Sequence, residues 1–137
     1  MKVLADTSVW SLALRRNDTA KLNPEERQLT ALLSEALNDG QVVMIGPIRQ
    51  EVLSGIRNPA QFERLKAALR AFHDEPLDME DYEEAARLYT RCRSRGLQCG
   101  PVDILICAVA HRRRWTVLSN DAGLNRCLEV GPEEDTK

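Results

Sequence analysis

The chain has 137 residues, enough for one domain with its own hydrophobic core. Hydrophobic residues make up 43% of it and charged residues 29%, the balance of a protein that folds in water rather than of a disordered or membrane-spanning chain. The net charge of −2 excludes a broadly basic nucleic-acid binder, but it allows a nuclease in which acidic metal ligands offset phosphate-binding arginines.

No apolar run is long enough to span a membrane, and the apolar start of the chain is interrupted at Asp6 and Thr7. We therefore expect no membrane contact, no secretory signal and a cytoplasmic location. The cysteines show neither C-x-x-C pairing nor a histidine at zinc-finger spacing. We expect four reduced thiols rather than a metal site or a disulfide framework, at Cys92, Cys99, Cys107 and Cys127.

Short apolar segments that predict strands alternate with longer segments that predict helices. In chain order the expected elements are a strand at 2–5, a helix at 7–14, a polar loop at 15–23, a helix at 24–38, a strand at 41–45, helices at 46–56 and 60–72, a strand at 74–77, helices at 80–95 and 101–112, a strand at 115–118 and a short fifth strand at 128–130. This alternation predicts an α/β domain over residues 1–131, a three-layer α/β/α sandwich around a parallel sheet of four to five strands. A flexible tail is expected at 132–137.

The spacing of apolar residues predicts which face of each helix is buried. In the helix at 24–38 the expected inward residues are Leu29, Leu32, Leu33, Ala36 and Leu37. In the helix at 80–95 they are Tyr82, Ala85, Ala86, Leu88 and Tyr89.

Four acidic residues are predicted to meet at one edge of this sheet. Asp6 and Asp121 each follow a strand directly, and Glu51 lies in the first turns after the second strand. Asp103 begins the helix that leads into the last long strand, and such a helix runs antiparallel to the strand that follows it. Because right-handed crossovers place all these points at the carboxyl ends of the strands, the four acids should converge.

Each acid also has a structural explanation. Asp6 and Asp121 could cap helices, and Glu51 and Asp103 could complement helix dipoles. Together, however, four close carboxylates repel one another unless a cation is bound. Oxygen ligands without nearby His or Cys favour Mg²⁺, with Mn²⁺ as a substitute. Asp6 and Asp103 are the expected main ligands, with the other two completing the site through waters or a second ion.

Such a site suits hydrolysis of a phosphodiester by metal-activated water. The hydroxyls of Thr7 and Ser119 could position water or phosphate, although helix capping is an equally simple role for them. Arginines at a helix C-terminus are favoured by the dipole, but those beside the loop that leads to Asp103, and one near Glu51, could also bind substrate phosphates. These candidates are Arg49, Arg91, Arg93 and Arg95. Residues 112–114 are expected at the opposite edge of the sheet, away from the acids.

Three segments occur in order along the chain: VLADTSVWSLALR, IGPIRQEVLSGIR and VDILICAVAHRRRWTVLSND. In them the sequence resembles the PIN-domain family and, within it, the VapC toxins of type II toxin–antitoxin systems. The resemblance implies a Mg²⁺-dependent endoribonuclease that cuts tRNA or ribosomal RNA, with the acidic positions of the family falling on Asp6, Glu51, Asp103 and Asp121. It also implies a cognate antitoxin, a homodimer, a larger hetero-oligomer with the antitoxin, and promoter DNA bound only through the antitoxin.

The fourth motif departs from the family pattern N-D-x-D-F, because Asp121 is followed here by Ala122, Gly123 and Leu124. Leu124 can replace the aromatic residue in the core. Gly123 lacks the second carboxylate, so we expect any second metal ion to be held more weakly, which makes Asp121 the least secure of the four positions.

Two other functions fit the same fold class. One is a catalytically silent PIN-fold module that binds RNA or an antitoxin, although such a module would have no use for a repulsive four-acid cluster. The other is a phosphoryl-transfer enzyme or phospho-acceptor domain. Against it, Asp6 is followed by Thr7 and Ser8 rather than by a second aspartate, and no suitable lysine follows the last strand.

Overall fold

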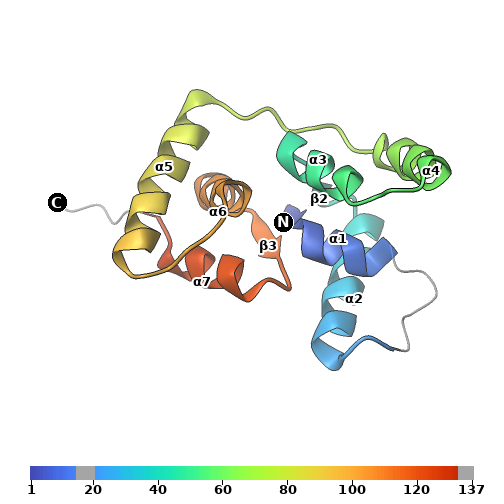
Figure 1. The fold of residues 1–137 in the computed structure, drawn as a ribbon, viewed down its shortest axis with the longest axis horizontal. Helices are drawn as coiled ribbons and strands as arrows, with labels where there is room; N and C mark the ends of the chain where they lie inside the picture. The colour runs from blue at the N-terminus through green and yellow to red at the C-terminus, as the bar shows by residue number, and fades with distance from the viewer. Residues whose placement is uncertain (15–20, 133–137) are drawn as a thin grey trace.

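The computed structural model describes residues 1–14 and 21–132, so the predicted features at 15–20 and 133–137 lie outside the described residues. Three strands and seven helices are found in the described part of the chain (Figure 1). They are β1 (Val3–Ala5), α1 (Thr7–Leu14), α2 (Pro24–Asn38), β2 (Val42–Val43), α3 (Gly46–Ser54), α4 (Pro59–Leu69), α5 (Met79–Ser94), α6 (Pro101–Arg113), β3 (Thr116–Leu118) and α7 (Ala122–Val130).

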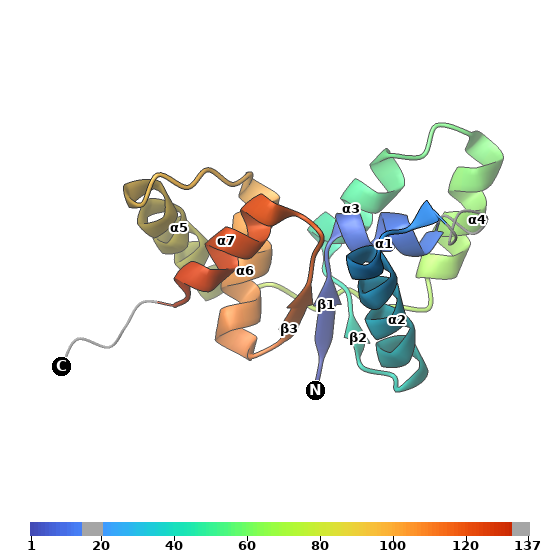
Figure 2. The same ribbon diagram turned by 90° about the horizontal axis from the view of Figure 1, so that it is seen from below.

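The three strands form one parallel sheet in the order β2-β1-β3. Central strand β1 places Val3 opposite Val42 on one side and Thr116 on the other. Figure 2 shows the strands side by side, with the beginnings of α3, α6 and α7 near the same end of the sheet. The carboxyl ends of the strands therefore face the elements that carry the predicted acids.

The sheet is smaller than the four to five strands predicted. The segment expected as a third strand contributes a single parallel bridge, from Met44 to Asp74. Glu75 donates to the Met44 carbonyl, and the chain then continues without further strand pairing to the start of α5. The expected strand at 128–130 is the end of α7, in which Leu124 and Cys127 are buried at helical spacing.

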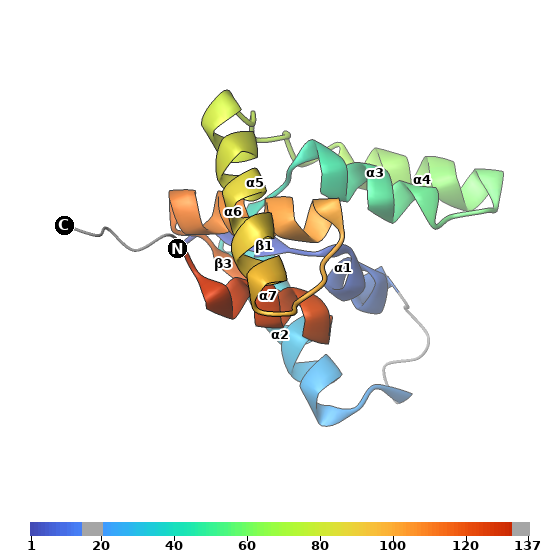
Figure 3. The same ribbon diagram turned by 60° about the vertical axis from the view of Figure 1, so that its left-hand side comes forward.

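Helices cover the sheet from both sides. Helix α2 packs against β1 and β2, and α6 packs against β3. Helix α5 lies outside this layer, across α6 and α7 (Figure 3). Because α6 is inserted between β3 and α5, residues 104–110 are all buried.

Capping residues set the helix starts close to the predicted positions. Asn23 and Glu26 form a reciprocal capping box around Pro24 at the start of α2, and Asp78 and Asp81 form another at the start of α5. On α2 only Leu33 and Ala36 are fully buried. Leu32 and Leu37 were predicted to face inward, but they are exposed, because α2 packs on α1, β1 and β2 through the side that carries Leu33 and Ala36.

The buried face of α5 is also not the one predicted. Tyr82 and Tyr89 are 54% and 46% exposed, whereas the face toward α6 and α7 carries two acids. The buried residues of α5 are Asp81, Glu84, Leu88 and Cys92. An apolar pattern could not reveal this face, because Asp81 is buried against two arginines of α6 and Glu84 is paired with two arginines of α5 itself.

Asp81 is fully buried and holds α5 to the end of α6. Its two carboxylate oxygens accept hydrogen bonds from Arg112 and Arg113. Burial opposes its ionisation, but the hydrogen bonds from the Asp78 backbone and from both arginines keep its pKa below the ordinary value. These contacts engage both arginines at the amino end of the sheet, away from the acids, as predicted for residues 112–114.

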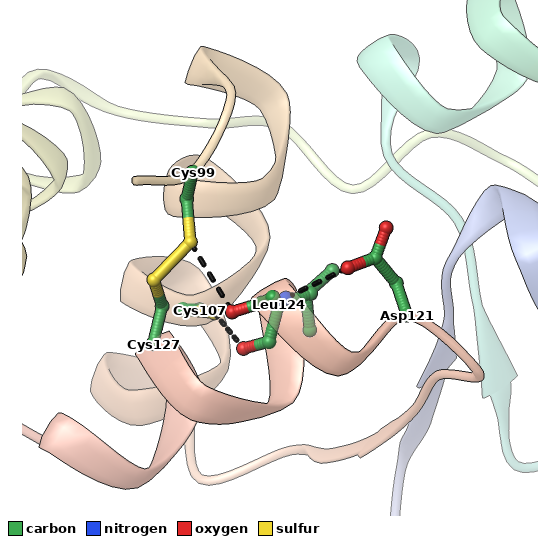
Figure 4. Close-up of a disulfide and its surroundings, with 6 residues drawn as sticks. Cys99, Cys107, Asp121, Leu124 and Cys127 are labelled. Carbon is green, nitrogen blue, oxygen red and sulfur yellow. Dashed lines mark hydrogen bonds between the residues drawn. A yellow bond between two sulfur atoms is a disulfide. The ribbon is translucent and has the colours of Figure 1, made fainter. Parts of the chain in front are cut away.

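A disulfide joins Cys99 to Cys127, with an S–S distance of 2.04 Å (Figure 4), so the expectation of four reduced thiols is wrong. The two cysteines are 28 residues apart, and only the packing of α7 beside α6 brings them together. The remaining cysteines, Cys92 and Cys107, are free and buried. The disulfide ties the segment just ahead of Asp103 to the helix that begins at Asp121.

Replacing Asp81 by Ala should lower the free energy of unfolding by about 3 kcal/mol, because two partly buried guanidinium groups would lose their shared carboxylate. The change is measured by urea denaturation. The matched control is Glu80→Ala, which removes only an exposed partner of Arg112 and should cost less than about 1 kcal/mol. Equal effects of the two substitutions would contradict the assigned role of Asp81.

Thiol titration of the denatured protein tests the disulfide. Without reductant, only Cys92 and Cys107 should react, whereas all four cysteines should react after reduction. Because the cross-link closes a loop of 28 residues, the Cys99→Ser/Cys127→Ser double variant should lose roughly 3 kcal/mol of stability. Four reactive thiols without reductant would show that the bond does not form.

Candidate active site

Asp6 is the most buried of the four predicted acids, with 4% of its surface exposed. It directly follows β1, and its backbone N–H extends the pairing with β3 by donating to the Leu118 carbonyl at 3.0 Å. One carboxylate oxygen accepts from the Ser8 hydroxyl and the Val9 amide, and the other accepts from the Ser119 hydroxyl at 2.6 Å. Asp6 thus caps α1 and is held in one orientation by hydroxyls from two elements.

The two candidate hydroxyl groups orient carboxylates. Thr7 donates through Oγ1 to Oε1 of Glu51 at 3.0 Å, which connects the start of α1 to α3. Ser119 donates to Asp6 and accepts from the backbone N–H of Asp121 at 3.0 Å, so one hydroxyl links two of the predicted acids. These hydrogen bonds fix the positions of the Asp6 and Glu51 carboxylates.

Ser8 is a further site residue that the sequence analysis did not identify. Besides donating to Asp6, its hydroxyl accepts from the backbone N–H of Asn120 at 2.9 Å. A serine two residues after an aspartate often forms a local turn, and this was the available signal. Its bond to Asn120 depends on β3 lying beside β1, which no local pattern encodes.

Asp103 shows that the four acids are close together. It lies in the first turn of α6 and is only partly exposed. Burial raises its pKa to about 6, and the charges of Asp121, Glu51 and Asp6 add to the increase. Charges that follow β1, lie on α3 and precede α7 thus all act on Asp103, which agrees with the placement expected from the sheet topology.

Asp121 has two roles. It caps α7, with Oδ1 accepting from the Leu124 N–H at 2.9 Å (Figure 4), and it adds to the negative potential at Asp103. Leu124 is fully buried, so it occupies the expected core position. A Cβ at Gly123 would lie 3.2 Å from Oδ1 of Asp121, so any larger residue there would crowd this carboxylate.

The donor set fits a hard divalent cation. The charges of Asp6, Glu51 and Asp121 act on Asp103, and within residues 1–14 and 21–132 none of the four forms an ion pair with Lys or Arg. In the same part of the chain, no three His, Cys, Asp or Glu side chains are arranged to hold an ion directly. Waters or small side-chain movements would therefore have to complete the coordination, which suits Mg²⁺ because it keeps several waters.

The predicted phosphate-binding arginines fall into two groups. Arg49 donates to Asp74 at 2.9 Å and to the carbonyls of Leu69 and Phe72, which favours a structural role at the end of α4. Arg91 is bound to Glu84 at 2.7 Å and to the Gly131 carbonyl. In contrast, Arg93 and Arg95 are exposed and form no ion pair with another described residue.

The pKa of Asp103 predicts a link between pH, metal and stability. Since its pKa is about 6 in the folded protein and 3.8 as an ordinary carboxyl group, the folded state binds more protons between these values. Metal-free protein should therefore gain stability from this group as the pH falls from 7 to 5, by about 1 kcal/mol after solvent screening. Mg²⁺ at pH 7 should stabilise the protein by offsetting the repulsion among the ionised carboxylates.

Thermal unfolding with EDTA or millimolar Mg²⁺ measures both effects as differences between wild type and Asp103→Asn. His111, whose pKa is lowered by burial, acts in the opposite direction but is present in both proteins. The exposed Asp39→Asn variant serves as the charge-matched control and should respond to Mg²⁺ and pH like wild type. An Asp103→Asn protein that keeps the full response to Mg²⁺ would exclude Asp103 as a ligand.

Comparisons with known proteins agree with this geometry. No curated protein gives a significant match to the sequence. Among solved structures, the chain is similar to FitAcB from Neisseria gonorrhoeae, with a TM-score of 0.71 and 21% sequence identity, covering 94% of each chain. This similarity supports the fold. The sequence model of the PIN domain matches residues 3–127, a range that includes all four acids.

PIN domains are generally nucleases, and they typically use divalent metal ions. The match extends from the start of β1 into α7, and it therefore spans the whole sheet and the site at its carboxyl edge. The chain belongs to the PIN domain family.

Proposed function

We propose that this protein is a Mg²⁺-dependent endoribonuclease and the toxin of a toxin–antitoxin module. The observation that carries the proposal is the coupling of Asp103 to Asp121, Glu51 and Asp6, which concentrates negative charge at one edge of the sheet. Membership of the PIN domain family supports nuclease activity. The resemblance of the three sequence segments to VapC toxins supports RNA as the substrate.

Asp6 and Asp103 would be the main ligands of the metal ion, with Glu51 and Asp121 completing the site. When bound, the ion would supply charge neutralisation and activation of water for attack on a phosphodiester. The chain itself fixes the acceptors: Ser8 and Ser119 hold Asp6, and Thr7 holds Glu51. Because these hydrogen bonds already exist, little reorganisation of the carboxylates is needed when substrate arrives.

Arg93 and Arg95 are the remaining candidates for contacts with RNA phosphates. Both follow the buried part of α5 and precede the loop that leads to Asp103. The proposed partners are a tRNA or ribosomal RNA substrate, a second copy of the chain, and a cognate antitoxin that would mediate binding to promoter DNA. Among the described residues no helix is long and apolar enough to cross a membrane.

Incubation of the purified protein with total RNA tests this function. We expect new 5′ ends in the presence of Mg²⁺ or Mn²⁺ and none with EDTA, as measured by sequencing of RNA ends. Asp103→Asn should reduce cleavage at least about a hundredfold, since a ligand to the ion is lost while the partial burial is kept.

The control Asp39→Asn should cleave at the wild-type rate, because Asp39 ends α2 at the other edge of the sheet. Metal-independent cleavage, or full activity of Asp103→Asn, would contradict the proposed mechanism. A folded wild-type protein that produces no new ends with either metal would favour the silent binding module.

A further inference from the structure

A pocket of about 420 Å³ lies beside the carboxylates, between α2 and the turn that leads from β3 into α7. Its size is within the range of about 300–1,000 Å³ typical of small-ligand sites. The lining residues used below are Glu25, Gln28, Leu29, Leu32, Asn120 and Asn125. Building on the proposed ribonuclease function, we propose that this pocket binds an unpaired nucleobase of the RNA next to the phosphate that is cleaved.

The pocket shares its wall with the acidic site. Ser119 lines the pocket, and its hydroxyl donates to Asp6 at 2.6 Å. Asn120 also lines the pocket, and its backbone N–H donates to Ser8, which in turn donates to Asp6. A base in the pocket is therefore separated from the metal-binding oxygens by one layer of side chains, so the phosphate of the same or the next nucleotide can reach them.

The polar lining suits the edge of a base. Three residues that line the pocket carry side-chain amides, Gln28, Asn120 and Asn125. Asn125 is oriented by donating through Nδ2 to the Ser119 carbonyl at 3.0 Å, which leaves its Oδ1 as an acceptor. The Gln28 and Asn120 amides form no hydrogen bond with another residue in the described part of the chain. Amide groups with free donors and acceptors are the usual readers of base edges.

The charge of the pocket argues against a phosphate as occupant. No Lys or Arg is found among the described residues that line it, and Glu25 adds a negative charge. Phosphate binding needs cations or converging backbone N–H groups. A neutral base with N–H donors is the chemistry that a carboxylate and an amide oxygen would recognise.

The apolar part of the pocket explains an unusual exposure on α2. Leu32 was expected in the core but is 40% exposed, and with Leu29 it provides an apolar surface in the pocket. A planar base can pack on such a surface while its edge meets the amides. Guanine is the best match, because its adjacent N1–H and N2–H groups can both be accepted by the Glu25 carboxylate.

The test uses the whole protein with a randomised single-stranded RNA pool and Mn²⁺ or Mg²⁺, and it reads base preference around the cut from sequenced 5′ ends. Wild type should prefer guanine at one position beside the cut. Glu25→Gln and Gln28→Ala should each weaken that preference about tenfold, the discrimination expected from one lost base contact. Both residues are exposed, so folding should be retained, which thermal unfolding verifies.

The matched controls are Glu83→Gln on α5 and Gln61→Ala on α4, which are exposed and outside the pocket. They should keep both the wild-type rate and the wild-type preference. If wild type cuts RNA and the pocket variants keep the wild-type base preference, the proposal of a base pocket is wrong but the ribonuclease function is retained. The pocket would then be a candidate site for a protein partner. If wild type cuts no RNA, the proposed ribonuclease function is wrong. Binding of the same RNA pool in EDTA then tests the pocket separately, by comparing the selection for guanine between wild type and Gln28→Ala.

Discussion

Repulsion among four carboxylates is the constraint on which the rest of this structure depends. Each acid lies on or beside a different element, and burial together with the charges of the other three raises the pKa of Asp103 to about 6. Such an arrangement is unfavourable without a counter-ion, so the surrounding structure has to hold it. Hydroxyls of Ser8, Ser119 and Thr7 do part of this by donating to Asp6 and Glu51.

The parts of the molecule far from the acids provide the remaining support. Helix α6 carries Asp103 at one end and is anchored at its other end, where Arg112 and Arg113 bind the buried Asp81 of α5. The Cys99–Cys127 disulfide connects the segment entering α6 to α7, whose first turn is capped by Asp121. Both anchors resist the displacement of charged residues that repulsion favours, and they leave the carboxyl edge of the sheet open to a ligand.

The failures of prediction have a common physical cause. The inward face of α5 was assigned to Tyr82 and Tyr89, but the buried Asp81 of this helix is stabilised by arginines at the end of α6. The pairing of Cys99 with Cys127 likewise depends on two helices lying side by side. Periodicity reports the average polarity of a face, and it cannot report a partner that arrives from another element.

The sequence by itself determined the order and type of most elements, the parallel sheet, and the meeting of Asp6, Glu51, Asp103 and Asp121 at one edge. It could do so because strand-to-helix turns in a parallel sheet all lie at the same end, so chain position alone places an acid there. Only the tertiary structure decided how the four acids are held. The contact of the Ser8 hydroxyl with Asn120, that of the Ser119 hydroxyl with Asp6, the engagement of Arg49 by α4 and the pocket beside the acids all join residues distant in sequence, and their distances depend on packing.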